Sequence, residues 1–281
     1  MARKAKVETI TKVATNQECA NKRQALSQMK RIKWNIDFKN QNQKKFWDTI
    51  ETNTISFCIG PAGCGKTYVA TYWALQNLVN KDSQFDGIIV TKPMVEVDGE
   101  KIGYLPGNVD EKTEPFMQSV YYNMEQIVGK QRLEVLRKAG IIKVIPMAYM
   151  RGLTLQNKIV LVDETQNTTK SQLKTLLTRI GQNSKYVVSG DLMQSDLRGN
   201  RDNGLEDAIK RFTGLYGCGF CKFDMNDIVR HPIVAELLDR YDDSYELGDS
   251  SAEVTLSEWL THPTYEVPRY NKRYELNQKK A

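Results

Sequence analysis

The sequence lacks any long apolar run and any secretory leader. No apolar stretch in its 281 residues approaches the roughly 20 residues that a membrane-spanning helix needs. The first six residues are basic, but they lead into no apolar segment, so we expect no secretory signal. These absences argue against a membrane protein and favour a cytoplasmic location.

Cysteine and histidine are also scarce. The chain has an odd number of cysteines, five, and they are scattered, which argues against a disulfide framework and fits a reducing compartment. The histidines are His231 and His262, and the pair Cys218 and Cys221 has no second ligand pair at metal spacing. We therefore expect no zinc site.

Internal repeats and linkers rich in glycine, serine or proline are absent as well. With 40% apolar and 26% charged residues, the composition is that of a globular protein. The sequence therefore predicts one domain with two extensions. We place a basic extension at residues 1–39, the folded domain at 40–241 and a tail, acidic and then basic, at 242–281.

The net charge of +6 conceals an asymmetry along the chain. Residues 1–45 hold 12 Lys/Arg and three acids, a net of +9, and residues 268–281 carry a net of +4. The remaining residues therefore carry 6 − 9 − 4 = −7. A basic leader is either an arm that binds the phosphates of a nucleic acid or a solvated terminus.

Short apolar runs alternate with amphipathic stretches through the central domain. The expected strands are Ile55–Ile59, Ile88–Val90, Ile142–Ile145, Ile159–Val162, Tyr186–Val188 and Phe220–Phe223. The expected helices are Glu18–Met29, Thr67–Val79, Glu114–Ile127, Arg132–Ala139, Lys170–Ile180, Gly204–Phe212 and Val234–Tyr241. This alternation predicts an α/β domain with a doubly wound, mostly parallel sheet.

The most specific motif is a P-loop at residues 60–67, which reads Gly-Pro-Ala-Gly-Cys-Gly-Lys-Thr and fits G-x-x-x-x-G-K-[ST]. An expected strand enters the loop and an expected helix leaves it. The glycines let backbone N–H groups point at phosphate oxygens, and the helix N-terminus attracts the same anion. We expect Lys66 to reach the β- and γ-phosphates and Thr67 to bind Mg²⁺. The expected nucleotide-binding residues are Gln43, Gly60, Pro61, Ala62, Gly63, Cys64, Gly65, Lys66, Thr67 and Tyr68.

Two carboxylates follow the apolar run at residues 159–162. We expect Asp163 to hold Mg²⁺ together with Thr67, and Glu164 to act as the general base on the attacking water. Such a glutamate favours hydrolysis over phosphate transfer to a small-molecule acceptor.

A third polar segment, residues 189–194, follows the run at 186–188. Asp-Glu-Thr-Gln at 163–166 and Gly-Asp-x-x-Gln at 190–194 resemble motifs II and III of superfamily 1 helicases. We expect Gln194 to sense the γ-phosphate. Gln43 resembles the glutamine with which such ATPases read adenine.

The series of motifs in this order resembles the PhoH-like ATPases over residues 42–241. Besides the segments above, the matching stretches are Lys-Pro-Met-Val-Glu at 92–96, Gly-Tyr-Leu-Pro-Gly at 103–107, Glu-Lys at 111–112, residues 146–154, residues 177–181, residues 190–197 and residues 227–232. The resemblance implies an ATP-hydrolysing cytoplasmic protein with a helicase-like motor domain and an RNA-linked role. The short chain is similar to phage-encoded versions, which would work in a host cytoplasm.

Two positions depart from the family pattern. Cys64 replaces the more usual Thr or Ser, and its thiol is expected to make the ATPase sensitive to oxidation. Thr91-Lys92 stands where the family has an arginine before the proline.

Superfamily 1 helicases complete the ATP site with arginines from a second motor domain, and the chain after Asp227 is too short to form one. An arginine must therefore come in cis or from a neighbouring subunit. The candidates are Arg151, Arg179, Arg198 and Arg230, of which we favour Arg179 and Arg230. This requirement predicts a homo-oligomer, such as a hexameric ring.

Three functions remain open on the sequence alone. The first is an ATPase coupled to single-stranded nucleic acid, with RNA favoured over DNA, that binds or unwinds it. The second is a nucleotide-dependent switch that binds a protein partner. The third is an ATP-linked ribonuclease, for which Glu96, Asp98 and Glu100 are the only candidate metal ligands.

Overall fold

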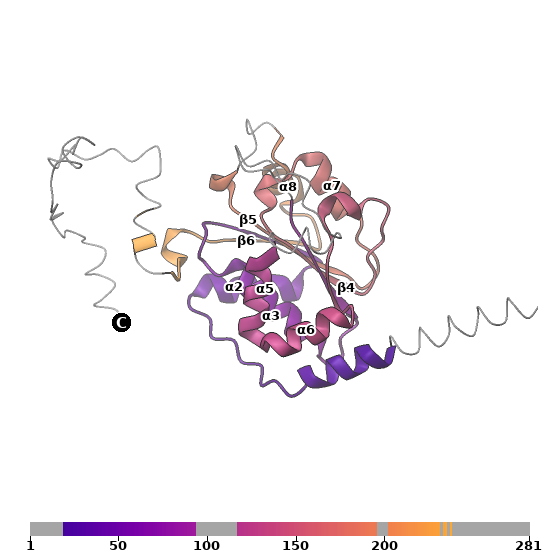
Figure 1. Cartoon of the computed structure of the whole chain (residues 1–281). Coiled ribbons are helices and arrows are strands. Elements are labelled where there is room, and N and C mark those ends of the chain that lie inside the picture. Colours follow the sequence, from indigo (N-terminus) through magenta and orange to yellow (C-terminus); the bar gives the residue numbers. More distant parts are fainter. Residues whose placement is uncertain (1–18, 94–116, 196–201, 231–232, 235–236, 238–281) are drawn as a thin grey trace, which may run out of the picture. The chain divides into compact units, whose positions relative to one another are not determined.

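A computed structural model describes residues 19–93, 117–195, 202–230, 233–234 and 237 (Figure 1). The chain divides into two units, Met1–Ile228 and Val229–Ala281. The first unit contains a sheet of six strands in the order β3-β2-β4-β5-β1-β6. All neighbouring strands are parallel. The strands are β1 (Ile55–Ile59), β2 (Gly87–Thr91), β3 (Ile142–Val144), β4 (Lys158–Val162), β5 (Lys185–Gly190) and β6 (Cys218–Lys222).

Helices cover both faces of this sheet. One face carries α2 (Gln41–Thr52), α3 (Lys66–Leu78), α5 (Gln118–Val128) and α6 (Lys130–Lys138), and the other carries α7 (Lys170–Leu177) and α8 (Gly204–Phe212) (Figure 1). Short 3₁₀ turns follow the strands: η2 (Met147–Met150), η3 (Thr165–Asn167), η4 (Leu192–Gln194) and η6 (Met225–Asp227). None of the helices in these described ranges is long and apolar enough to cross a bilayer.

Two hydrophobic clusters lie on either side of the sheet. Because side chains alternate along a strand, Ile88 and Val90 pack in the cluster with α3, α5 and α6, whereas Ile89 packs in the cluster with α7 and α8. Every residue of β2 is buried. Burial on both faces explains why the strands read as continuous apolar runs.

The doubly wound parallel fold expected from the sequence is confirmed. The strand β1 and the helix α8 have the expected bounds, while β6 begins two residues earlier than expected. The helix α2 was not predicted, because its sequence is mostly polar and buries just Gln43, Phe46 and Ile50. The predicted helix at 234–241 lies almost entirely outside the described residues, as do the candidate metal ligands at 96–100 and Arg198.

Candidate nucleotide site

Three motifs meet at the carboxyl edge of the sheet, where the parallel strands end. Because β1 pairs with β5 and β5 pairs with β4, the ends of these strands lie side by side. The N–H group of Gly60, after β1, donates to the carbonyl oxygen of Gly190 at 3.1 Å. Asp163 follows β4, and Asp191 follows β5. Ligands of open parallel sheets bind at this edge.

The P-loop has a backbone that requires glycine. Gly60, Gly63 and Gly65 have φ angles of 155°, 89° and 82°. A Cβ on Gly60 would lie 2.6 Å from the Cβ and 2.7 Å from the carbonyl oxygen of Phe223. The helix α3 begins directly after Gly65, and no side chain caps its first N–H groups. This end of α3 can therefore offer its backbone N–H groups to an anion.

Lys66 lies over the loop. Its ammonium group donates to the carbonyl oxygens of Gly60 and Pro61, both at 2.7 Å. An ammonium group has three N–H donors, so one is left for another acceptor. Lys66 is thus held where a bound phosphate chain would pass.

Thr67 and Asp163 come together beside the P-loop. The Thr67 hydroxyl lies 3.2 Å from Oδ2 and 3.4 Å from Oδ1 of Asp163. The Asp163 side chain is buried, and the Ser189 hydroxyl donates to its Oδ1 at 2.7 Å. Within the described ranges, no cluster of three His, Cys, Asp or Glu side chains suits a metal. A hydroxyl and one carboxylate fit Mg²⁺, which takes its other ligands from phosphate and water.

Glu164 has a left-handed backbone, with φ 53° and ψ 38°. This conformation is uncommon for a residue other than glycine. The side chain is exposed, and its Oε2 accepts a hydrogen bond of 2.7 Å from Nε2 of Gln166. Glu164 is therefore oriented at the edge of the site while its carboxylate remains open to water.

Comparison with known proteins gives the family of this chain. The profile of the PhoH-like proteins matches residues 35–242. The chain belongs to the PhoH-like protein family. Among its relatives, the PhoH-like protein of Synechocystis sp. is 42% identical over 72% of this chain and 61% of its own length. The PhoH-like protein of Bacillus subtilis is 40% identical, over 74% and 64%. Protein PhoH of Escherichia coli is 37% identical, over 72% and 57%.

These matches span about three fifths of the relatives' length. Among solved structures, the large terminase of a thermophilic bacteriophage aligns with a TM-score of 0.47 and 12% identity, over 73% of this chain and 50% of that one. The parallel sheet and the P-loop at the end of β1 make this PhoH-like domain a P-loop NTPase fold.

Gln166 is a residue that the sequence analysis quoted but did not select. Its side chain is 1% exposed, and its Oε1 accepts from the N–H of Asp191 at 3.0 Å while its Nε2 donates to Glu164. A Cβ on Gly190 would lie 3.0 Å from that same Oε1. The side chain of Gln166 therefore ties the end of β4 to the end of β5. Its place after Asp-Glu-Thr was the available signal.

Asp191, rather than Gln194, is the buried side chain of the third motif. Burial raises the pKa of the Asp191 carboxyl, while the N–H of Met193, the ammonium of Lys66 and the N–H of Ala62 oppose the rise. The structure thus brings Asp191 to the P-loop. Gln194 is exposed, and its N–H donates to the carbonyl oxygen of Asp191 at 3.1 Å. Its sensing role stays a prediction.

Gln43 is 4% exposed and uses both ends of its amide within the protein. Its Nε2 donates to the carbonyl oxygen of Cys64 at 2.9 Å, and its Oε1 accepts from the N–H of Lys39 at 2.9 Å. Gln43 thereby supports the P-loop, and its contact with adenine stays a prediction. Tyr68, on the first turn of α3, is 37% exposed.

The expected oxidation sensitivity of Cys64 does not agree with its surroundings. The side chain is fully buried, and its Sγ lies 3.7 Å from the carbonyl oxygen of Asp224. Burial raises the pKa of the Cys64 thiol to about 11, although Lys66 opposes the rise. A thiol that is buried and protonated reacts slowly.

The two favoured arginines lie outside the P-loop edge of the first unit. Arg179 follows α7, and its guanidinium donates to the carbonyl oxygens of Thr175 at 3.2 Å and Leu153 at 3.4 Å. Its own carbonyl oxygen accepts from the N–H of Leu155, which precedes β4. Arg179 therefore lies at the amino ends of the strands, opposite the P-loop of its own chain. Arg230 is exposed and belongs to the second unit, and its role stays a prediction.

Proposed function

We propose that this PhoH-like chain binds ATP with Mg²⁺ and hydrolyses it in the cytoplasm, in a manner coupled to single-stranded nucleic acid, preferably RNA. The observation that carries the proposal is the contact between the Thr67 hydroxyl and the Asp163 carboxylate beside the P-loop. This pair joins the motif after β1 to the motif after β4. Its two oxygens are the ligands expected of a P-loop magnesium site.

Each part of the site has a task in hydrolysis. The N–H groups of the loop and the first turn of α3 bind phosphate oxygens, and Lys66 exchanges its carbonyl partners for them. When bound, Mg²⁺ neutralises negative charge on the phosphates. Thr67 and Asp163 hold the ion, and the Ser189 hydroxyl orients the carboxylate of Asp163.

Glu164 is the base of the proposed reaction. Its carboxylate takes a proton from the water that attacks the terminal phosphate. The hydrogen bond from Gln166 fixes one carboxylate oxygen and leaves the other for that water.

Exposed side chains at the carboxyl edge support a contact with a single strand. Tyr149, on η2 after β3, is 63% exposed, and Met193, on η4 after β5, is 84% exposed. Arg151, directly after η2, is exposed as well. An exposed ring beside a cation suits a nucleotide, whose base stacks and whose phosphate is charged.

The position of Arg179 supports an assembly of several copies. At the amino ends of the strands it is remote from its own P-loop, so it would complete the ATP site of a neighbouring subunit. A homo-oligomer, such as a hexameric ring, meets this need. Sedimentation of a fully active monomer would contradict this part of the proposal.

The proposal is tested by steady-state ATP hydrolysis with no polymer, with single-stranded RNA and with single-stranded DNA. We expect the wild type to hydrolyse ATP and RNA to raise kcat several-fold. Lys66→Ala removes a charge from the phosphate site and should lower the rate by about 100-fold or more. Lys81→Ala, at an exposed lysine in the loop after α3, is the matched control and should retain the wild-type rate.

The two halves of the proposal fail separately. If the wild type and Lys66→Ala share one residual rate, the P-loop of this chain does not support hydrolysis. If ATP is hydrolysed but neither polymer changes the rate or binds, the nucleic-acid half fails. That second result would favour the nucleotide switch that binds a protein partner.

A further inference from the structure

The described surface has one region where basic residues gather. Residues 19–33 include five Lys/Arg and no Asp or Glu, and α6 includes four Lys/Arg and one acid, Glu134. The chain between the basic leader and the basic C-terminus has a net charge of −7, so this concentration runs against its average. We call residues 19–33, α6 and Lys143 of β3 the basic face.

Packing holds the two parts of the basic face together. Residues 19–29 are helical, and their Ala25 and Met29 are buried in the same hydrophobic cluster as Leu133 and Leu136 of α6. Figure 1 shows this N-terminal helix beside α6. The leader is therefore docked at this point, and its cations add to those of α6.

A hollow of about 450 Å³ lies between the two helices. Its walls include Arg31, Lys130 and Arg132, and no carboxylate lines it. The guanidinium of Arg132 is held there, because its Nη1 donates to the carbonyl oxygen of Val128 at 3.1 Å. Four of the five guanidinium N–H donors remain for an anion.

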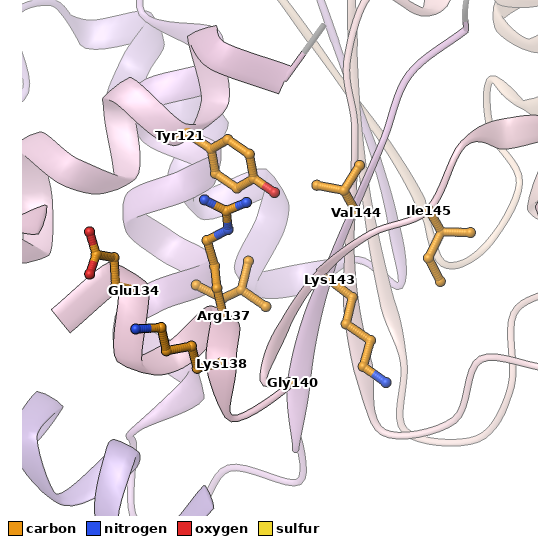
Figure 2. Close-up of a pocket in the computed structure, with 9 residues that line it drawn as sticks. Tyr121, Glu134, Arg137, Lys138, Gly140, Lys143, Val144 and Ile145 are labelled. Carbon is orange, nitrogen blue, oxygen red and sulfur yellow. The ribbon is translucent and has the colours of Figure 1, made fainter. Parts of the chain in front are cut away.

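A second hollow, of about 570 Å³, lies on the β3 side of α6 (Figure 2). Its cations are Arg137, Lys138 and Lys143, with Glu134 at the α6 wall. The guanidinium of Arg137 lies over the ring of Tyr121, 4.2 Å from its centre. The two hollows make α6 a basic ridge between basic depressions. Its nine residues span about 12 Å, the rise of three to four nucleotides of a strand.

The basic face is distinct from the edge that carries the P-loop. The carbonyl oxygen of Ile141, which links α6 to β3, accepts from the N–H of Ile88 and would lie 2.8 Å from a Cβ on Gly87. Gly87 is the first residue of β2, so α6 ends at the amino edge of the sheet. A ligand of this face would leave the ATP site open.

We infer that the basic face binds the phosphate backbone of a single-stranded nucleic acid, as a second contact away from the ATP site. The inference rests on the proposed coupling to nucleic acid and adds where the strand is held. Exposed cations around open hollows suit a repeating phosphate, which needs charge at intervals and no sequence readout. Binding here is therefore expected to depend strongly on salt and weakly on base sequence.

The test measures the affinity of full-length protein for a fluorescein-labelled single-stranded RNA by anisotropy, between about 50 and 200 mM KCl. The variant Lys130→Glu/Arg132→Glu reverses two cations of the first hollow. The control Lys174→Glu/Lys210→Glu makes the same change of four charge units at exposed lysines of α7 and α8, on the other face of the sheet. Thermal melting of each variant confirms folding. We add Arg31→Glu, on the opposite wall of the hollow, as a second probe.

We expect Lys130→Glu/Arg132→Glu to bind RNA at least tenfold more weakly at low salt. Its plot of log affinity against log salt should be shallower by about 0.7 for each RNA phosphate that the variant no longer neutralises. Arg31→Glu should weaken binding in the same direction, and the control should stay within about twofold of the wild type.

Three outcomes decide the matter. Equal losses in both double variants would reduce the effect to overall charge and overturn the inference. Unchanged RNA binding by the α6 variant would also overturn it, including when an acidic protein rather than RNA proves to need these residues. If the wild type hydrolyses ATP but binds neither RNA nor DNA, the coupling in the proposed function has failed, which is a different result.

Discussion

The carboxyl edge of the sheet and the basic face are built on opposite principles. At the edge, Asp163, Gln166 and Asp191 are each at most 8% exposed, and hydrogen bonds fix their positions. On the basic face, Lys130, Arg132 and Lys143 are exposed. Hydrolysis needs preorganised groups around one phosphate, whereas a phosphate backbone needs cations at intervals. Geometry therefore matters most at the edge, and net charge matters most on the face.

The largest effect is expected from a methyl group at Gly60 of the P-loop. Gly60→Ala would bring a Cβ within 2.7 Å of the Phe223 backbone at a φ of 155°. We expect it to destabilise the fold by about 3 kcal/mol and to abolish ATP binding. Thermal melting and nucleotide binding measure the two effects.

Gly214→Ala is the matched control for that change. Gly214 also has a positive φ, 84°, but a Cβ there meets no atom within 4 Å. We expect a cost of about 1 kcal/mol and normal ATP binding. Equal losses in the two variants would show that strain alone, and not the fit of the P-loop against Phe223, accounts for the effect.

A like charge beside Glu164 tests whether Gln166 positions the base. Gln166→Glu keeps an acceptor for the N–H of Asp191 but replaces the donor to Glu164 with a second carboxylate. Two adjacent carboxylates cannot both ionise easily, so the acid limb of the kcat profile should move to higher pH by about one unit or more. The KM for ATP should change little.

Gln172→Glu makes the same substitution in the capping box of α7, where a glutamate still accepts from the N–H of Thr169. Its pH profile should match the wild type. A purely structural Gln166 would lower stability in the Gln166→Glu variant and leave the pH profile where it was.

A smaller effect of opposite sign is expected at Asp191. Burial raises the pKa of this carboxyl above its ordinary 3.8, so the ionised form at neutral pH weakens the folded state. Asp191→Asn should therefore melt at a higher temperature than the wild type at pH 7. The gap should close as the pH falls below the ordinary value, where the carboxyl is protonated in both states.

The control for Asp191→Asn is Asp82→Asn, at an exposed carboxyl. It should melt with the wild type at every pH. ATP hydrolysis by Asp191→Asn should fall, since the buried charge beside Lys66 serves the site and not stability. A lower melting temperature for Asp191→Asn at pH 7 would refute this assignment.

The smallest effect is expected at Cys64. With a thiol pKa of about 11, about one molecule in a thousand is thiolate at pH 8. A thiol reagent should therefore modify exposed Cys19 first and leave ATP hydrolysis unchanged. Rapid modification of Cys64 in the folded protein, with loss of activity, would restore the expectation drawn from sequence.

The sequence revealed those parts of the site that lie in short continuous segments. The P-loop at residues 60–67 and the pair Asp163 and Glu164 each follow a strand, so their meeting at one edge follows from a parallel sheet. Contacts between distant segments were not readable in this way. Gln166 meets Asp191 because β4 pairs with β5 in one register, and Cys64 is buried by a segment 160 residues away.

The same limit applies to the basic face. The charge of the leader was evident from its composition, and α6 was expected as a helix. That Ala25 and Met29 pack with Leu133 and Leu136 depends on tertiary contacts, which place the two sets of cations together.

The most direct test of the account measures ATP binding and ATP hydrolysis together in Glu164→Gln. The substitution keeps the shape of the side chain and removes the base, while Glu125→Gln on α5 serves as the control. We predict that Glu164→Gln binds Mg²⁺-ATP as tightly as the wild type and hydrolyses it about 100-fold more slowly or worse, with the control unchanged. Hydrolysis by Glu164→Gln at the wild-type rate would contradict the central claim that the carboxyl edge is a P-loop ATPase site with Glu164 as its base.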